Sequence, residues 1–208
     1  MTENTINLFD FIYSSHSNPM TSEFKRGDII FHEGDNPDHL CLVEKGLVGL
    51  FHYSETGKET FLRVFGNKSI CGLRSFFANE AYQGSAIALK PTQLLLISKK
   101  ECEQLCTQHP ELLKKVTQLL AIDLGIAESR LAGLQDKSAH LRTVETLIFL
   151  KEKYPDQVWT RKEIAEYAGT TFETVTRTMS SLEKEGHITK VGRDFSFTNI
   201  QYLLDKNF

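Results

Sequence analysis

The sequence predicts an α+β protein with an N-terminal antiparallel β-roll of the jelly-roll type, a long helix and a C-terminal winged helix-turn-helix. Three observations lead to this fold class. Glycines separate short apolar runs in the first half of the chain, apolar residues recur every seven positions in the middle, and two short helical patterns meet at a glycine near the end. The three predicted parts are residues 1–108, 109–136 and 137–208.

The β-roll is predicted from the stretch between residues 21 and 98. Its short runs alternate or are fully apolar, and glycines separate them at intervals of 6 to 12 residues, as in an antiparallel barrel or sandwich. Residues Ser54–Lys58 suit a hairpin loop. The segment Gly72–Ser85 interrupts the strands as a short helix and loop. It could hold an anion or polar ligand at the helix N-terminus, or it could plug the roll with Phe76 and Phe77.

A long helix is predicted from Glu111 to about Gln135, after a shorter helical run Lys99–Cys106. Its apolar stripe resembles a coiled-coil seam and is too long for a small monomer to cover, so we expect a homodimer. The alternative is a helix packed only against its own roll. Asp123 and Arg130 lie on or beside the seam and would weaken it. The predicted interface residues are Leu113, Val116, Leu120, Ala127, Leu131 and Leu134.

The helix-turn-helix is predicted between Trp159 and Ile188, after a helical pair between Ala139 and Tyr154. Thr160 and Glu163 form a capping-box pattern for a first helix over about residues 161–168. Gly169 then makes the turn, and Thr170 or Thr171 caps a second helix. The apolar stripe of that second helix consists of Val175, Met179 and Leu182.

The other face of the second helix carries Phe172, Glu173, Thr176 and Arg177. Glu173 and Arg177 could form a surface ion pair, since they are four residues apart. They could also read bases, because arginine offers two donors to guanine and glutamate accepts from the cytosine amino group. After this helix, two short runs of alternating apolar and polar residues lie on either side of a glycine. This pattern predicts a two-stranded wing and favours DNA as the binding partner.

The charge distribution is compatible with DNA binding but does not by itself indicate it. Residues 1–136 carry 13 basic and 17 acidic side chains, whereas residues 137–208 carry 11 and 10. A local basic patch on the C-terminal part can therefore contact the phosphate backbone. The predicted phosphate contacts are Thr160, Arg161, Lys162, Thr171, Thr174, Lys190 and Arg193.

Composition argues against a membrane-spanning, secreted or disulfide-bonded protein. A hydrophobic content of 40% supports proper cores, and no stretch approaches the length of a membrane span. The first fifteen residues have no basic region leading into an apolar run, so we expect no secretory signal. The four cysteines form no Cys-x-x-Cys pair, although Cys102 and Cys106 are one helical turn apart. They are expected to be buried, reduced thiols of a cytoplasmic protein.

A roll, a long helix and a winged helix-turn-helix, in this order, resemble the Crp/Fnr family of bacterial transcription regulators. The resemblance covers nearly the whole chain and is strongest in TRKEIAEYAGTTFETVTR and GDIIFHEGD. In the Fnr branch the recognition helix carries Glu-x-x-Ser-Arg, matched here by residues 173–177 with Thr176 for serine. Phe172 stands where cyclic-AMP receptors carry arginine, and Thr178 stands where an aliphatic residue is usual. The resemblance implies a homodimer that binds double-stranded DNA at TTGAT-type half-sites and contacts RNA polymerase.

The resemblance also implies which effectors to expect. Cyclic-AMP binders have Gly-Glu in the phosphate cassette and a later Arg-Ser-Ala, whereas this chain reads Gly72-Leu73 and Gly84-Ser85-Ala86. Cyclic AMP is therefore not expected, although Arg74 could replace the missing cation. No cysteine precedes Cys41, so an iron–sulfur cluster of the Fnr type is not expected either. The candidate effector pocket consists of Gly72, Leu73, Arg74, Ser75, Gly84 and Ser85. Haem is a remaining candidate cofactor, and its candidate ligands are His16, His32, His39, His52 and Cys71.

An enzyme on a cupin-like barrel is the competing class. Cupin metal sites need a His-x-His pair with a following glutamate and a distal histidine, and no His-x-His occurs in the chain. No Ser/His/Asp pattern or phosphate-binding glycine loop occurs either. The sequence therefore predicts a regulator without enzymatic activity, whose roll senses something other than cyclic AMP or nothing at all.

Overall fold

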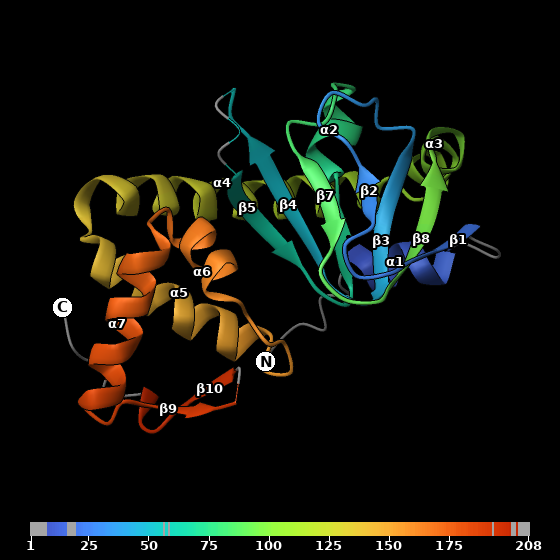
Figure 1. Ribbon diagram of the computed structural model, residues 1–208. Coiled ribbons are helices and arrows are strands. Elements are labelled where there is room, and N and C mark those ends of the chain that lie inside the picture. Colours follow the sequence, from blue (N-terminus) through green and yellow to red (C-terminus); the bar gives the residue numbers. More distant parts are fainter. Residues whose placement is uncertain are drawn as a thin grey trace, which may run out of the picture. The chain divides into compact units, whose positions relative to one another are not determined.

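The computed structural model describes residues 8–15, 20–55, 57, 59–192, 194–200 and 203. The chain divides into two compact units, one of Met1–Lys58 with Leu62–Ala127 and one of Glu59–Phe61 with Glu128–Phe208. Figure 1 shows the elements of both units. Among the described helices, none is both long and apolar enough to cross a bilayer.

In the part of the chain that the structure describes, eight strands form the β-roll as two four-stranded sheets (Figure 1), which confirms the predicted fold class. One sheet has the strand order β1-β8-β3-β6 and the other β2-β7-β4-β5. The strands are β1 (Met20–Phe24), β2 (Ile29–Phe31), β3 (His39–Lys45), β4 (Val48–Tyr53), β5 (Glu59–Phe65), β6 (Ser69–Cys71), β7 (Ser85–Ala88) and β8 (Thr92–Ser98). In the predicted hairpin loop, Gly57 N–H donates to Ser54 O at 2.8 Å, whereas Thr56 and Lys58 lie outside the described residues.

Among its described residues, the first unit has four helices beside the strands. They are α1 (Leu8–Ser15), α2 (Leu73–Ala78), α3 (Lys99–Gln108) and α4 (Glu111–Asp136), of which α4 continues into the second unit. A capping box between Ser98 and Glu101 starts α3. The short helix predicted after Gly72 is α2, and the long predicted helix is α4.

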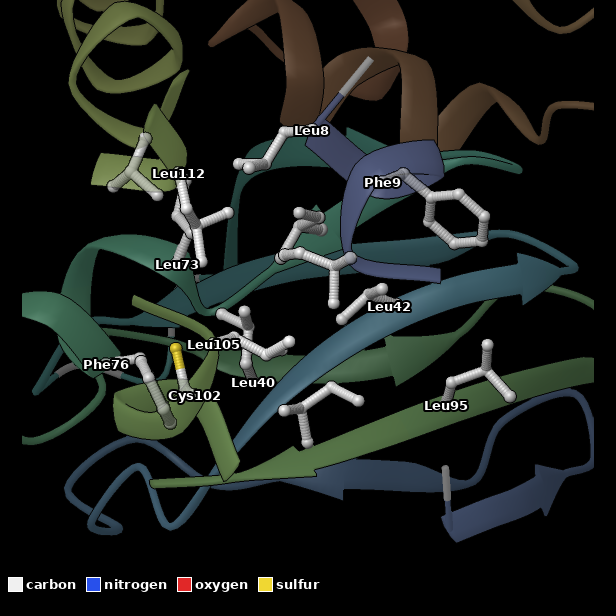
Figure 2. Close-up of a cluster of buried hydrophobic side chains, with 14 residues drawn as sticks. Leu8, Phe9, Leu40, Leu42, Leu73, Phe76, Leu95, Cys102, Leu105 and Leu112 are labelled. Atoms are coloured by element: carbon white, nitrogen blue, oxygen red, sulfur yellow. The ribbon is translucent and has the colours of Figure 1, made fainter. Parts of the chain in front are cut away.

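An apolar cluster joins these helices to the sheet that contains β3 and β8 (Figure 2). The sequence reasoning did not predict α1, whose Leu8, Phe9 and Ile12 are buried in this cluster. Their spacing brings all three to one face of a short helix, but eight residues do not form a stable helix alone. Burial of such side chains contributes roughly 1.5–3 kcal/mol each, so α1 depends on the roll that it covers.

A second cluster fills the interior of the roll. It contains Phe31, Cys41, Cys71 and Tyr82 among its buried residues. The rings of Phe31 and Tyr82 stack with centroids 3.6 Å apart and an interplanar angle of 12°. A Cβ atom on Gly72 would lie 2.8 Å from Cε1 of Tyr82, so the ring occupies the space beside that glycine.

After the end of α4, the described part of the second unit contains three helices and a two-stranded wing. These elements are α5 (Ala139–Lys153), α6 (Arg161–Ala168), α7 (Phe172–Lys184), β9 (Ile188–Val191) and β10 (Asp194–Phe197). The helical pair predicted over residues 139–154 is wrong, because a single helix α5 spans that stretch. Its uninterrupted buried side includes Val144, Leu147 and Leu150, which explains why it does not break.

The two polar residues that we expected to weaken the seam of α4 have intramolecular partners. The Arg63 guanidinium pairs with Asp123, with Nη1 donating to Oδ2 at 2.8 Å. In the second unit, the Arg130 guanidinium lies over the ring of Tyr167 at 4.3 Å and donates to Tyr167 O at 3.0 Å. These contacts satisfy both charges within one chain, so neither has to be compensated across a seam.

Candidate DNA interface and sensor site

The first helix of the helix-turn-helix begins at a complete capping box. Glu163 N–H donates to Thr160 Oγ1 at 3.1 Å, and Thr160 N–H donates to Glu163 Oε2 at 2.7 Å. Each side chain thus satisfies a backbone donor that the helix itself leaves unpaired. Ile164, Ala165 and Ala168 then form the buried side of α6. The start of α6 is therefore fixed by residues that are close in sequence.

The turn between α6 and α7 depends on Gly169, which has φ = 62°. Only glycine adopts this left-handed conformation without strain, and Thr170 N–H then donates to Ala165 O at 2.9 Å. Arg142 of α5 also contacts this turn. Its guanidinium donates to Ala168 O and Gly169 O, each at 3.0 Å. Sequence reasoning missed Arg142, because nothing local to it indicates that its target is a turn 26 residues away.

The second helix, α7, is positioned by its buried side. Thr171 caps it, because Thr174 N–H donates to Thr171 Oγ1 at 3.2 Å. Val175, Met179 and Leu182 are buried as the apolar pattern predicts. Thr178 is buried as well, and its hydroxyl forms a hydrogen bond with Nδ1 of His140 at 3.1 Å. That bond satisfies a polar group at a position where an aliphatic residue was expected.

The outer side of α7 presents three of the four predicted base-reading residues to solvent. Phe172 is 50% exposed, and Glu173 and Arg177 are exposed, with no ion pair between these two among those of the described residues. Thr176 is half-buried, and its hydroxyl oxygen is buried without a hydrogen-bond partner in the described part of the chain. A hydroxyl in this position is poorly placed to reach a base, which weakens the prediction for Thr176.

The carboxylate of Glu173 is held at the start of α7. Hydrogen bonds from its own backbone N–H and from the Thr171 hydroxyl lower the pKa of Glu173. The side chain is therefore charged at neutral pH. An exposed carboxylate and an exposed guanidinium one helical turn apart offer an acceptor and a paired donor along one edge of the helix.

The predicted phosphate contacts form a mixed set. The hydroxyls of Thr160, Thr171 and Thr174 take part in the two helix caps described above. Lys190 of the wing pairs with Glu183 of α7. Arg161 is half-buried, and its Nε has no hydrogen-bond partner within the described part. Arg193 lies outside the described residues.

Of the described cations in this set, Lys162 is the most exposed, and two carboxylates lie beside it. Its Nζ lies 2.8 Å from Glu59 Oε2 and 3.3 Å from Glu166 Oε1. The hydrogen bond to Glu59 raises the pKa of Lys162. Burial, followed by the charge of Glu59, raises the pKa of Glu166 to about 7. A phosphate group would have to compete with both carboxylates for this lysine.

Stability should fall as pH rises through the window between the ordinary pKa of Glu166 and about 7. Because its pKa is raised on folding, the folded state binds more protons there than the unfolded state. Glu166→Gln removes this titration, so its thermal midpoint should change less than that of the unaltered protein between about pH 5 and pH 7.5. Glu152→Gln, at an exposed position of α5, is the control. Parallel curves for Glu166→Gln and the unaltered protein would contradict this assignment.

The six predicted pocket residues do not gather around a cavity. Gly72 takes a left-handed conformation (φ = 75°) as the N-cap of α2, and Leu73 is buried in the apolar cluster of Figure 2. The Arg74 guanidinium donates to Glu80 Oε2 at 2.9 Å and to Ser75 Oγ at 3.2 Å. Arg74 therefore already has an anionic partner, which argues against its use as a substitute phosphate ligand.

The later pair, Gly84 and Ser85, lies against the strand β4 and the loop after β2. A Cβ atom on Gly84 would lie 2.7 Å from the carbonyl oxygen of Phe51, so no larger residue fits the backbone as it stands. Ser85 Oγ accepts from Glu33 N–H at 3.0 Å. An arginine at position 84, as in a cyclic-nucleotide cassette, would need this part of the roll to move.

Two cavities of the roll lie elsewhere. One, of about 400 Å³, is lined by Phe24, Ile30, Phe31, Asp35, Asn36, Asp38, His39, Cys41, Tyr82 and Leu96. The other, of about 630 Å³, is lined by Glu33, Gly34, His52, Glu80, Ala81, Tyr82 and Gln83. None of the six predicted residues lines either cavity, whereas Tyr82 lines both. Sequence reasoning missed Tyr82, and an aromatic residue within the segment Gly72–Ser85 was the only signal for it.

The candidate haem ligands are dispersed. His52 Nδ1 lies 3.1 Å from both carboxylate oxygens of Glu33, and His39 lines the smaller cavity. His32 is exposed, Cys71 is fully buried, and His16 lies outside the described residues. Across the described residues, no group of three or more His, Cys, Asp or Glu side chains could hold a metal ion.

The outer side of α4 carries a row of exposed apolar residues. The exposed fractions of Leu113, Leu124, Leu131 and Leu134 are 48%, 60%, 59% and 50%. Val116 differs, because it is buried in the apolar cluster of the roll. It therefore lies outside the surface that a second chain could cover, which contradicts the prediction that Val116 belongs to the dimer interface. Leu120 is half-buried against the same cluster, and Ala127 is exposed.

Two family models match the chain. A cyclic nucleotide-binding domain matches residues 21–109, and a Crp-like helix-turn-helix domain matches residues 142–206. Together they cover the roll and the three-helix unit with its wing. The DNA-binding element is thus the helix-turn-helix of α6 and α7, in agreement with the prediction from the capping pattern and the turn glycine.

Similarity over about four fifths of the chain extends to two named regulators. The cyclic AMP receptor protein of Thermus thermophilus is 30% identical over 165 residues, which span 78% of this chain and 76% of that protein. The transcriptional activator protein Anr of Pseudomonas aeruginosa is 25% identical over 179 residues, 82% of this chain and 73% of that protein.

Solved structures show the same fold. A CRP/FNR-family regulator of Thermus thermophilus superimposes with a TM-score of 0.76 at 26% identity, covering 89% of this chain and 97% of that chain. FixK2 of Bradyrhizobium japonicum gives 0.82 at 21% identity, covering 91% and 97%. The chain belongs to the Crp/Fnr family of DNA-binding transcription regulators, which are not enzymes.

Proposed function

We propose that the protein is a homodimeric regulator that binds a palindrome with TTGAT-type half-sites, and that its roll senses a signal other than cyclic AMP or none. The observation that carries the proposal is the exposed edge of α7, where Glu173 and Arg177 stand one turn apart. Arginine binds guanine through two donors, and glutamate accepts from the amino group of cytosine. Phe172 at the start of the same edge can contact a thymine methyl group.

The proposed dimer rests on the outer side of α4. Its leucines are about half exposed in a single chain, although an exposed apolar row of this length is unfavourable in water. Pairing two copies of the helix would bury the row on both chains. A two-fold symmetric dimer carries two recognition helices, as a palindrome with half-sites one turn of DNA apart requires.

The direct test measures binding to two labelled duplexes by fluorescence anisotropy. One duplex holds two TTGAT half-sites in inverted repeat, and the other holds the same bases in shuffled order. The protein should prefer the palindrome by at least a thousandfold at physiological salt, with two chains on each duplex. Equal affinity for both duplexes would refute sequence-specific binding at such half-sites.

Cyclic AMP and cyclic GMP should not bind at tens of micromolar. Leu73 and Gly84 stand where cyclic-nucleotide cassettes carry a glutamate and an arginine, so two charge-assisted partners are absent. Each such partner contributes roughly 1.5–3 kcal/mol, and the loss of both should cost a hundredfold or more in affinity. Titration calorimetry with each nucleotide should give no heat of binding.

The Thermus relative that is named a cyclic AMP receptor protein provides the positive control for this titration. The anisotropy assay adds a second readout, because an activating nucleotide would strengthen binding to the palindrome. Micromolar binding of either nucleotide would show that another cation has replaced the arginine. The Arg74 guanidinium, released from Glu80, would then be the first candidate.

We also propose contact with RNA polymerase, by resemblance to the family, through surfaces of the roll and of the C-terminal unit. Co-purification of the polymerase on promoter DNA, with and without this protein, tests the contact.

A further inference from the structure

Two buried cysteines face each other across neighbouring strands of the roll. Cys41 of β3 and Cys71 of β6 are direct partners in the antiparallel register, followed by the pairs Leu42–Ile70 and Val43–Ser69. Opposed residues in such a ladder have Cα atoms about 4.5–5.5 Å apart. A disulfide requires a Cα separation of about 4.4–6.8 Å, so the backbone can accept a bond here without moving.

The smaller cavity gives small molecules access to one of these thiols. Cys41 lines it, together with the stacked rings of Phe31 and Tyr82. Asp35 and Asp38 belong to the same lining and are exposed, so the cavity has a polar, solvent-facing side. Its volume of about 400 Å³ is ample for a molecule the size of a peroxide.

The two sulfur atoms have unequal surroundings. Cys71 is fully buried, and its hydrogen bond with Cys41, followed by burial, raises its pKa well above the usual range. Cys71 therefore stays protonated at neutral pH and donates toward Cys41. Cys41 lines the cavity and Cys71 does not, so Cys41 is the sulfur of the pair that a small molecule can reach.

We propose that Cys41 and Cys71 form a peroxide-reactive pair that closes a cross-strand disulfide inside the roll. In the first step the Cys41 thiolate attacks the O–O bond of a peroxide, forming a sulfenic acid and, after protonation, releasing water or an alcohol. In the second step the Cys71 sulfur attacks the sulfenic sulfur, its proton leaves with the departing hydroxyl, and water is released. The two thiols lose two electrons and the peroxide gains them.

The bond would tie β3 to the strand that leads into Gly72 and α2. This segment follows Cys71 directly and contributes Leu73 and Phe76 to the apolar cluster. Oxidation would thus constrain the segment that corresponds to the ligand-binding part of the roll in cyclic-nucleotide binders. The disulfide lies within the roll and does not depend on the proposed DNA site.

The other two cysteines provide an internal comparison. Cys102 and Cys106 lie one turn apart on α3, where Cβ atoms are about 5–6 Å apart. A disulfide needs about 3.5–4.5 Å between Cβ atoms, so this pair cannot close without distorting the helix. Burial raises the pKa of Cys102 to about 12, while Cys106 is partly exposed. We expect oxidation to link the cross-strand pair and not the helical pair.

The experiment treats the reduced full-length protein with hydrogen peroxide, alkylates the remaining thiols and maps the peptides by mass spectrometry. The expected product is a disulfide within one chain that links Cys41 to Cys71, with the mass of that chain lower by two hydrogen atoms. A reducing agent should restore both thiols. If Cys106 is oxidised while Cys41 and Cys71 remain alkylatable, the proposal is wrong.

Two variants test the order of the steps. In Cys71→Ala, peroxide should leave a sulfenic acid on Cys41 that dimedone traps, because no second thiol can resolve it. In Cys41→Ala, Cys71 should stay a free thiol. The reverse pattern would overturn the assigned roles. The double variant Cys102→Ala/Cys106→Ala should still form the linkage, and near-equal thermal midpoints confirm that each variant is folded. The mapping of the unaltered protein decides the proposal even if a variant misfolds.

Discussion

Leu124→Asp should convert the proposed dimer to a monomer and abolish tight binding to a palindrome. Leu124 is 60% exposed at the centre of the apolar row on α4, so the unpaired chain tolerates a charge there. In a dimer the same carboxylate would be buried without a partner, which costs roughly 3–5 kcal/mol. Dimerisation should weaken by more than a hundredfold, roughly as that cost implies. Sedimentation or light scattering measures the change in mass.

Ile122→Asp provides the matched control. Ile122 lies two residues away on the same helix and is 61% exposed, but a step of two residues turns it to the other side of α4. This variant should remain a dimer and bind DNA as before. A monomeric mass for the unaltered protein, with or without DNA, would disprove the dimer. Equal effects of the two substitutions would place the interface on another side of the helix.

Arg177→Ala should weaken binding to the palindrome and relax the preference at one G·C pair of each half-site. A guanine contact through two hydrogen bonds discriminates by roughly 1–3 kcal/mol, which corresponds to about 5- to 150-fold per half-site. Each fold-change is measured by anisotropy against a series of duplexes with one base pair replaced at a time. The loss should be confined to the guanine position.

Lys162→Ala and Lys190→Ala are the comparison variants. Both residues are exposed cations on the same unit, and contacts to phosphate carry no sequence information. They should weaken all duplexes alike and reduce the salt dependence of binding by about one counterion per contact. If Arg177→Ala behaves like the two lysine variants, Arg177 contacts the backbone and does not read a base.

The parts of the fold that the sequence predicted are those fixed by neighbouring residues. The capping box of Thr160 and Glu163 and the left-handed turn at Gly169 are local features, and both occur where the pattern placed them. The roll followed from glycine spacing and strand-like runs, since each turn needs a residue that can reverse the chain. These signals do not depend on the rest of the molecule.

The parts that the sequence missed depend on distant contacts. The N-terminal helix α1 forms because the roll offers Leu8, Phe9 and Ile12 an apolar surface. Arg142 contacts a turn that only the folded chain brings near. Tyr82 stacks on Phe31, more than fifty residues earlier in the chain. The predicted pocket residues do not line the cavities for the same reason, because the location of a cavity depends on which side chains fill the roll.

Selection of bound duplexes from a randomised pool tests the central claim most directly, because it presupposes no binding site. The full-length protein is incubated with the pool at physiological salt, and the bound fraction is amplified and sequenced over several rounds. The account predicts enrichment of two TTGAT-type half-sites in inverted repeat, with centres about one turn of DNA apart. Enrichment of a single unpaired site, or of no sequence at all, would contradict the claim that the protein reads a palindrome as a dimer.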